Sequence, residues 1–511
     1  MDTSRARAAR PDPAGTSPAA RAGPTRSVPP VTVPPPGPAG TGADDTGLLP
    51  KVVARRRRHL LALLGLVAVL SAAGLVLGLL SWAPEPADPP RALTAAESQR
   101  LAAVRVTNYR DLRAGVQVTF GAGAARTELV GWVDWSRPLL YVDVGGPGAG
   151  SERGLLQATP TVVVIRHDPT ATPTAARPPL VPPADRWRLH ELAAGSALRP
   201  VLDLLFDLAA DRPDPAGAPP VADARWVARE DVEVGPVDVF EAPLPGRAAA
   251  GALPPDPARY WVDADARLHR LTARLAAAGP VTVTVNRPDR PTLRPVDALG
   301  GRPGLPRALT TAEQARLQRL PERLRARGGA TVTLTAPVDP RTNLRGTGWL
   351  SWTARTAYLA VTDLCTPERR TLLRRGADAT VRATVTAEGD PEKPAPPPLP
   401  PPAGAGWTSE RAGTDALTRL VDAALAAGRS TPRGTAVRLR EDSVADRAVD
   451  VVELRGGGDQ LRYWIDRDGL LRRVELRTRP GIWAQLDLTP GSVPPLPAPT
   501  PAHAPSGRPS R

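Results

Sequence analysis

The sequence predicts an α+β protein in which two tandem domains of antiparallel sheet follow one transmembrane helix, with disordered tails at both ends. Two observations support this prediction. A stretch from Arg259 to Leu271 returns in related form from Arg462 to Val474, and both copies place aromatic and β-branched residues before a short polar turn, as β-hairpins do. An uncharged apolar run from Leu60 to Trp82 is long enough to cross about 30 Å of hydrocarbon as a helix, which takes roughly 20 residues.

The repeat extends over most of the chain, because five blocks recur in the same order. Such a match indicates an internal duplication. The pairs are Pro90–Glu97 with Pro306–Glu313, Gly131–Trp135 with Gly348–Trp352, Trp187 with Trp407, Arg229–Asp231 with Arg440–Asp442, and the two hairpin stretches. We therefore expect two homologous domains at residues 84–292 and 306–490, joined by a linker at 293–305.

Residues 1–54 are rich in proline and lack apolar periodicity, so we expect a disordered tail. Residues 55–83 combine the basic flank Arg55–Arg58 with the apolar run. The arginines favour a cytoplasmic N-terminus, which places the domains outside a bacterial cell membrane crossed once. A cleaved signal peptide is the competing interpretation. The fifty-residue leader, the length of the run and Pro84 argue against it.

The first domain is predicted to contain runs of strands interrupted by one or two helices, a pattern that favours α+β. Thr94 and Glu97 form a capping-box pattern at the start of the first helix. The expected elements are a helix at Leu93–Arg105; strands at Val116–Phe120, Leu129–Asp134, Leu139–Val144 and Thr161–Arg166; an inner helix at Ser196–Ala210; and strands at Ala224–Val227, Val237–Glu241, Arg259–Asp263, Leu268–Leu275 and Val281–Val285.

The second domain follows the same plan. Thr310 and Glu313 repeat the capping box, and this helix is expected to end before Pro321. The inner helix is expected at Ala416–Ala427 and the last strand at Ile482–Leu488. Residues 491–511 are expected to be disordered.

The turn of the second hairpin, Asp466–Gly469, is a strong signal because Asp-Gly readily takes the positive φ of a tight turn. After it, Val474 and Leu476 are expected to point to one face of the sheet. The residues between them, Arg473, Glu475 and Arg477, are expected to point to the other.

Composition excludes several classes of protein. Arginines are dispersed with acidic residues between them, so the formal net charge of +14 does not form the basic stripe of a nucleic-acid binder, and we expect no nucleic-acid partner. Cys365 is the single cysteine, which rules out an intrachain disulfide. We expect it to be a small, buried or half-buried apolar residue.

No catalytic constellation is found, and we expect no catalytic, metal-binding or cofactor-binding residues. The five histidines are scattered without metal-ligand spacing. His269 aligns with Arg472 and is expected to face solvent. The carboxylate pairs Asp263/Asp265 and Asp466/Asp468 lie in predicted tight turns, where Asp side chains bond nearby amides, and not in the apolar site that raises the pKa of a general acid.

Tryptophans recur at matched positions in the two domains, and core packing is their first interpretation. The alternative is that some of them line an apolar cavity for a hydrophobic guest. The candidate lining residues are Trp132, Trp261, Leu202, Leu205, Phe206, Trp349 and Trp464.

Each half resembles the LolA/LprG-like lipoprotein-carrier superfamily, which includes RseB-like regulatory domains. The resemblance lies in an N-terminal helix, a string of antiparallel strands, an inner apolar helix and the Tyr-Trp-Val-Asp segment at 260–263, with its copy Tyr-Trp-Ile-Asp at 463–466. It implies a half-barrel over helices that encloses a groove for acyl chains. Members are usually single domains that are soluble or attached through a lipidated cysteine. The duplicated, anchored form departs from that pattern.

Two functions follow as hypotheses. In the first, the two extracytoplasmic domains bind a lipid or other hydrophobic ligand without catalysis. In the second, the same domains bind a protein partner as an interaction or sensing module, similar to regulators of anti-sigma factors. An enzyme is not supported by any site in the sequence.

Overall fold

A computed structural model describes residues 52–81 and 88–496, with gaps at 169, 172, 216, 218–220, 234, 247–256, 411–414 and 457. The chain divides into two compact units, residues 1–85 and 86–511. The predicted tail at 1–51, the membrane-proximal residues 82–87 and the predicted tail from 497 onward lie outside the described residues. Residues 491–496, predicted to be disordered, include the end of the last strand and Leu496, which packs against an aromatic cluster around Tyr358.

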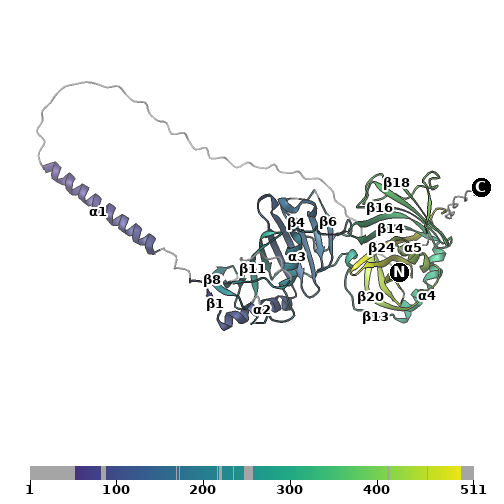
Figure 1. Cartoon of the computed structure of the whole chain (residues 1–511), viewed down its shortest axis with the longest axis horizontal. Coiled ribbons are helices and arrows are strands. Elements are labelled where there is room, and N and C mark those ends of the chain that lie inside the picture. The colour runs from purple at the N-terminus through teal and green to yellow at the C-terminus, as the bar shows by residue number, and fades with distance from the viewer. Residues whose placement is uncertain are drawn as a thin grey trace, which may run out of the picture. The chain divides into compact units, whose positions relative to one another are not determined.

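In the first unit, α1 (Val52–Ser81) is a single long helix (Figure 1). Its segment Leu61–Gly78 is long and apolar enough to cross a membrane, and none of it is buried. At the rise of an α-helix, these 18 residues span about 27 Å. Length and composition therefore agree with the predicted anchor.

The second unit contains two sheets of twelve strands each. We call residues 88–292 the first repeat and residues 306–491 the second repeat. The strands of the first repeat are β1 (Arg91–Ala92), β2 (Arg113–Phe120), β3 (Thr127–Asp134), β4 (Leu139–Gly145), β5 (Gly154–Ala158), β6 (Val163–His167), β7 (Arg188–His190), β8 (Arg225–Val232), β9 (Gly235–Ala242), β10 (Ala258–Val262), β11 (Leu268–Leu275) and β12 (Gly279–Asn286).

The second repeat has the same number of strands. They are β13 (Arg307–Ala308), β14 (Gly329–Asp339), β15 (Thr342–Ser351), β16 (Thr356–Asp363), β17 (Arg369–Arg375), β18 (Thr380–Thr386), β19 (Thr408–Glu410), β20 (Thr435–Val444), β21 (Arg447–Arg455), β22 (Leu461–Asp466), β23 (Leu471–Arg479) and β24 (Ile482–Gly491).

The two sheets have the same topology. The first runs β1-β8-β9-β10-β11-β12-β2-β3-β4-β5-β6-β7, and adding twelve to each strand number gives the order of the second. All the strand pairs are antiparallel, as the recurrence of the hairpin predicts. Equal strand order in both repeats is what an internal duplication requires.

Each repeat has one capped helix and one inner helix. The capped helices are α2 (Ala95–Asp111) and α4 (Thr311–Arg327), and both carry the complete capping box expected from the sequence. The inner helices are α3 (Leu198–Asp207) and α5 (Ala416–Ala427). Short 3₁₀ segments complete the fold, among them η1 (Gly123–Ala125), η2 (Pro147–Glu152) and η4 (Asp297–Leu299).

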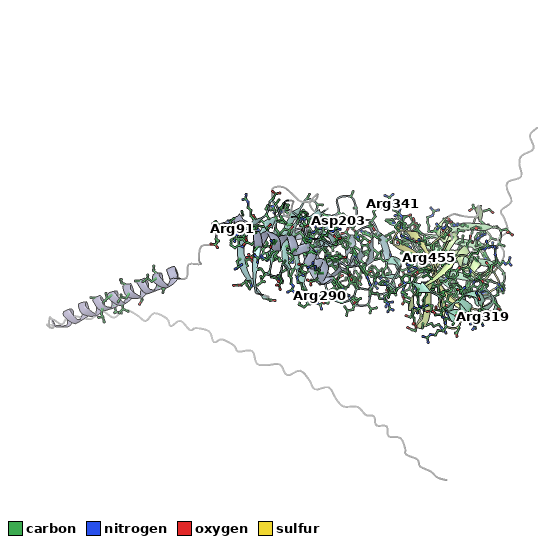
Figure 2. All side chains as sticks on the ribbon, turned by 90° about the horizontal axis from the view of Figure 1, so that it is seen from below. Arg91, Asp203, Arg290, Arg319, Arg341 and Arg455 are labelled. Carbon is green, nitrogen blue, oxygen red and sulfur yellow. The ribbon has the colours of Figure 1, made fainter. Side chains whose placement is uncertain are left out.

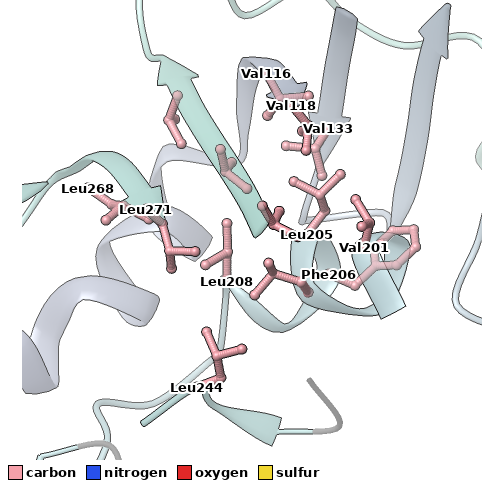
Figure 3. Close-up of a cluster of buried hydrophobic side chains, with 14 of the residues drawn as sticks. Val116, Val118, Val133, Val201, Leu205, Phe206, Leu208, Leu244, Leu268 and Leu271 are labelled. Atoms are coloured by element: carbon pink, nitrogen blue, oxygen red, sulfur yellow. The ribbon is translucent and has the colours of Figure 1, made fainter. Parts of the chain in front are cut away.

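Residues alternate between the two faces of each sheet. We call the face that packs on α3 or α5 the inner face and the opposite one the outer face. In the first repeat, strand side chains such as Val118 and Leu271 meet Leu205 and Phe206 of α3 in one buried core (Figure 3). The second repeat builds the equivalent core around Leu420 and its neighbours on α5.

Several details differ from the prediction. The helix at α4 continues past Pro321, because the cost of one missing N–H bond is offset by burial of the apolar face that carries Leu320 and Leu324. Strands β1, β5 and β7 were not predicted. Cys365, expected to be buried or half-buried, is exposed in the turn after β16. Figure 2 shows Arg319, Arg341 and Arg455 on the outside of the repeats, as the dispersed charge predicts.

Of the residues predicted as a linker, 293–305, the part from 293 to 301 is packed into the structure, and 302–305 are exposed. Leu293, Val296 and Ala298 belong to a buried cluster with Trp187 of the first repeat and Ile482 of the second. The repeats also meet directly, since the amide of Leu189 donates to Asn343 Oδ1 at 2.9 Å and Arg345 Nη2 donates to the carbonyl of Trp187 at 2.7 Å.

Candidate functional site

The predicted lining residues lie in separate places. Leu202, Leu205 and Phe206 are at most 8% exposed and fill the space between α3 and the inner face. The four tryptophans lie on the outer faces, in clusters apart from that core. Trp132 belongs to the cluster between the repeats, Trp261 to a cluster with Val237 and Val239, Trp349 to the Tyr358 cluster, and Trp464 to a cluster with Leu439 and Val451.

Two further tryptophans have a structural role that the duplication preserves. Trp135 Nε1 donates to the carbonyl of Leu205, and Trp352 Nε1 donates to the carbonyl of Ala424, both at 3.0 Å. Each bond ties the sheet to the inner helix. These contacts agree with core packing as the first interpretation of the tryptophans.

The second repeat has a cavity of about 460 Å³ on its inner face, between β14–β18 and the N-terminus of α5. Val338, Leu344, Val361 and Leu417 supply its apolar lining. The polar part includes Thr371, Thr384, Arg369 and Arg382, together with the carboxylates of Asp363, Glu368 and Asp415. Sequence reasoning missed this site. The available signal was the presence of Thr and Arg at inner-face positions of β17 and β18.

Arg382 is fixed at the mouth of this cavity. Its Nη2 donates to Asp415 Oδ2 and to Thr418 Oγ1, both at 2.8 Å. Asp415 is also the N-cap of α5, and accepts from the amide of Thr418 at 3.1 Å. The pKa of Asp415 is lowered, because these hydrogen bonds and the Arg382 charge outweigh its burial. The carboxylate therefore stays charged and holds the guanidinium at the rim.

In the first repeat, a loop occupies the corresponding place. The connection from β4 to β5 contains η2, and its Ala149 is buried in the core of the repeat. Ser196, just before α3, donates to Glu152 Oε1 at 3.3 Å and holds the loop there. The matching connection in the second repeat, residues 364–368, is shorter. The inner face of the second repeat is therefore accessible at this place, whereas that of the first repeat is covered by the loop.

The first repeat has its own cavity, of about 600 Å³, on the outer face of its sheet. Trp261 is the one predicted lining residue that borders it, together with Gln117, Glu230, Arg270 and Thr284. Trp261 Nε1 donates to Glu230 Oε2 at 2.8 Å, and the Arg270 guanidinium lies 4.9 Å from the centre of the Trp261 ring.

The equivalent face of the second repeat buries a cluster of charges. Glu475 is fully buried, and neither of its oxygens has a hydrogen-bond partner among the residues that the structure describes. Arg462 Nη1 lies 3.5 Å from Glu475 Oε2, and Arg473 Nη1 lies 3.9 Å from its Oε1. Burial raises the pKa of Glu475 to about 7, although the two arginines act in the opposite direction. The residue was predicted only to face away from the core of the repeat.

The predicted turns are confirmed, and one side chain departs from expectation. Asp263 accepts from the amides of Asp265 and Arg267, each at 2.9 Å, as Asp does in tight turns. His269, expected to face solvent, is half-buried with Nε2 2.9 Å from Asp263 Oδ2. Its counterpart Arg472 makes the same contact with Asp466 at 2.7 Å. The duplication thus retains a donor to the turn carboxylate.

Among the residues that the structure describes, no three His, Cys, Asp or Glu side chains are grouped to hold a metal ion. No model of a known protein family matches this chain, and no curated protein matches it in sequence. The cavities and their side chains therefore provide the grounds for a function.

Proposed function

We propose that this chain is a membrane-anchored, non-catalytic binding protein whose second repeat holds an acyl chain with an anionic headgroup. The cavity between β14–β18 and α5 is the observation that carries this proposal. Its volume of about 460 Å³ falls in the range of roughly 300–1,000 Å³ that is typical of small-molecule sites. The half-barrel expected from the family resemblance would place a lipid on this inner face.

The chemistry of the lining suits an amphipathic ligand. Apolar side chains from Val338, Leu344, Val361 and Leu417 would take the acyl chain, at about 0.8 kcal/mol for each methylene removed from water. The exposed Arg369 stands at the rim, where a carboxylate or phosphate group would lie, and Arg382, already paired with Asp415, lies beside it. α1 would keep this site close to a membrane, on the extracytoplasmic side that the Arg55–Arg58 flank favours.

Photocrosslinking tests the proposal. The full chain in detergent micelles is irradiated with a diazirine-bearing fatty acid, and the labelled peptides are identified by mass spectrometry. We expect labels on peptides that contain Val361 or Leu417. Labelling confined to α1 would contradict the proposal.

A tryptophan placed inside the cavity provides the matched comparison. Thr384→Trp puts an indole into the space between β17 and α5 and should reduce labelling at least fivefold. Thr386→Trp lies two residues along the same strand, outside the cavity lining, and should leave labelling unchanged. Equal loss in both variants would point to disturbance of the sheet and not to occupation of the site.

The alternative, a protein-interaction module, is favoured by a different observation. Residues 294–301 of this chain already lie across the outer face of the second sheet, so this kind of surface accepts a peptide segment.

A further inference from the structure

The outer-face cavity of the first repeat corresponds to a place on the outer face of the second repeat, and there a segment of the chain covers it. Strand register makes the comparison residue by residue, since Tyr260 pairs with Leu271 as Tyr463 pairs with Val474. The corresponding pairs are Trp261 with Trp464, Arg270 with Arg473, Thr284 with Asp487, Ala228 with Arg440, and Glu230 with Asp442.

This register corrects one block of the predicted repeat. The block Arg229–Asp231 was matched with Arg440–Asp442, but Arg229 corresponds to Glu441. Both strands carry a bulge at the same point, so the register is equivalent on either side of it, and the letters matched in the sequence lie one position apart in the sheet.

In the second repeat, residues 294–301 cover this face, and we call them the covering segment. Arg294 pairs with Asp442 at 3.6 Å, and Asp297 accepts from Arg473 Nη1 at 2.6 Å. The carbonyl of Gly300 accepts from Arg462 Nη1 at 3.2 Å. A basic residue and an acidic residue three positions later therefore anchor the segment.

At two equivalent positions the repeats carry different residues, and these differences leave the outer face of the first repeat uncovered. Arg440 lies over the Trp464 ring at 5.2 Å, whereas its counterpart Ala228 ends at Cβ and supplies no such cation to the Trp261 ring. Arg473 is also paired with Asp487 in its own sheet, where the first repeat has Thr284.

Arg270 is consequently a cation that faces the cavity from above an aromatic ring. Within the described residues, no ion pair joins Arg270 to a carboxylate, while its counterpart Arg473 has three. Glu230 uses Oε2 to accept from Trp261 and retains acceptor capacity for a basic group.

We propose that this cavity binds a segment of a partner protein that carries a basic residue three positions before an acidic one. The acidic side chain pairs with Arg270 and the basic side chain with Glu230, as Asp297 and Arg294 pair with Arg473 and Asp442 in the second repeat. The site is on another repeat and another face than the acyl cavity, so each proposal can fail without the other.

The probe is a fluorescein-labelled peptide with the sequence of residues 292–301, Thr-Leu-Arg-Pro-Val-Asp-Ala-Leu-Gly-Gly. Fluorescence anisotropy is recorded with the full chain in detergent micelles. We expect a Kd below about 1 mM, weaker than a folded interface gives because the peptide loses conformational freedom on binding. The covering segment is tethered to the second repeat at a high effective concentration, so the free peptide does not displace it.

Three changes separate this site from nonspecific binding. Replacing the aspartate of the peptide by asparagine should weaken binding at least tenfold, and this arm leaves the protein unaltered. Arg270→Ala should weaken it by a similar factor, while Arg274→Ala on the same strand should not. Glu230→Gln should also weaken binding, because it removes the charge that pairs with the basic residue of the peptide.

No anisotropy change up to about 1 mM peptide would overturn the proposal, because such affinities lie at the limit of specific recognition. Equal binding of both peptides, or equal binding to wild type and Arg270→Ala, would overturn it as well. Thermal unfolding of each variant, compared with wild type, shows whether lost binding reflects lost structure.

Discussion

Arg473 on β23 donates a hydrogen bond of 2.6 Å to the carboxylate of Asp297, which lies between the two repeats in sequence. A second carboxylate, Asp487 on β24, also pairs with this guanidinium. These carboxylates raise the pKa of Arg473 against the opposing effect of burial. Through this contact, the segment that joins the repeats becomes part of the second one.

Asp297→Asn should loosen this segment. Replacing the carboxylate by an amide weakens a hydrogen bond to a charged donor, which we expect to cost about 1–2 kcal/mol of unfolding free energy. Limited trypsin digestion should show faster cleavage after the exposed Arg302, a few residues downstream. Asp265→Asn is the control, since this carboxylate is in an exposed turn and pairs only with Arg267 among the described residues. Unchanged cleavage in Asp297→Asn would mean that apolar packing alone holds the segment.

Stability should fall as pH rises from about 4.5 to about 7, because the folded pKa of Glu475 is about 7 and its ordinary value is 4.5. Between these pH values the folded state holds a proton that the unfolded chain releases, so the free energy of unfolding decreases as pH rises. The full effect is on the order of 3 kcal/mol. Arg440, Arg462, Arg473 and Asp297 surround the carboxylate.

Glu475→Gln should flatten this part of the pH profile and make the protein more stable than wild type at pH 8. Urea denaturation followed by tryptophan fluorescence at pH 5 and pH 8 measures both effects. Glu453→Gln on β21 is the control and should leave the slope in place. A wild-type stability that rises through this pH range, with the same slope in Glu475→Gln, would show that the carboxylate stays charged.

The capping glutamates Glu97 and Glu313 should give stability the opposite pH dependence to that of Glu475. Hydrogen bonds from Arg91 and Arg307 lower the pKa of Glu97 and Glu313 to about 2. Their contribution to stability is therefore complete above pH 4.5 and is lost as pH falls toward 2. Each Glu→Gln change should cost about 1–2 kcal/mol at neutral pH, and the double variant should show the sum, because the two sites belong to different repeats.

Denaturation at pH 7 and pH 3 provides the measurement. The deficit of the variants should shrink at pH 3, where the wild-type carboxylates begin to take up protons. A deficit that is the same at both pH values would indicate that the stability lost in the variants does not come from the charge of the carboxylates.

The sequence predicted local elements of structure better than the contacts between elements that are distant in sequence. Capping boxes, hairpin turns and inner helices depend on neighbouring residues, and Thr94, Gly469 and Ala416–Ala427 are where they were expected. The cavities depend on which side chains meet across strands distant in sequence. No local pattern shows that Ala228 stands where the other repeat has Arg440, because the Arg-Glu-Asp letters that the two strands share are one residue out of register in the sheets.

Glu475 illustrates the same limit. Alternation along β23 correctly placed it on the face away from the repeat's core. Its complete burial results from residues 294–301, which cross this face. Their proline and glycine content led to the prediction of a linker. The predicted lining residues Leu202, Leu205 and Phe206 were correctly assigned to an apolar inner helix, but α3 packs so closely on the sheet that these side chains contact protein on all sides.

The two hairpin turns provide a matched test of backbone strain. Gly469 has φ = +73°, and the equivalent Ala266 has φ = +60°. A left-handed conformation costs an L-residue roughly 1–2 kcal/mol, and glycine avoids this cost while losing more entropy on folding. Ala266→Gly should therefore raise the unfolding free energy by about 0.5–1 kcal/mol, and Gly469→Ala should lower it by at least as much, because its new Cβ would lie 3.1 Å from Arg323 Nη1. Urea denaturation of both variants at pH 7 measures the effect, with Ala264→Gly as control for added chain entropy. A loss of stability in Ala266→Gly would show that entropy, and not backbone strain, dominates at this turn.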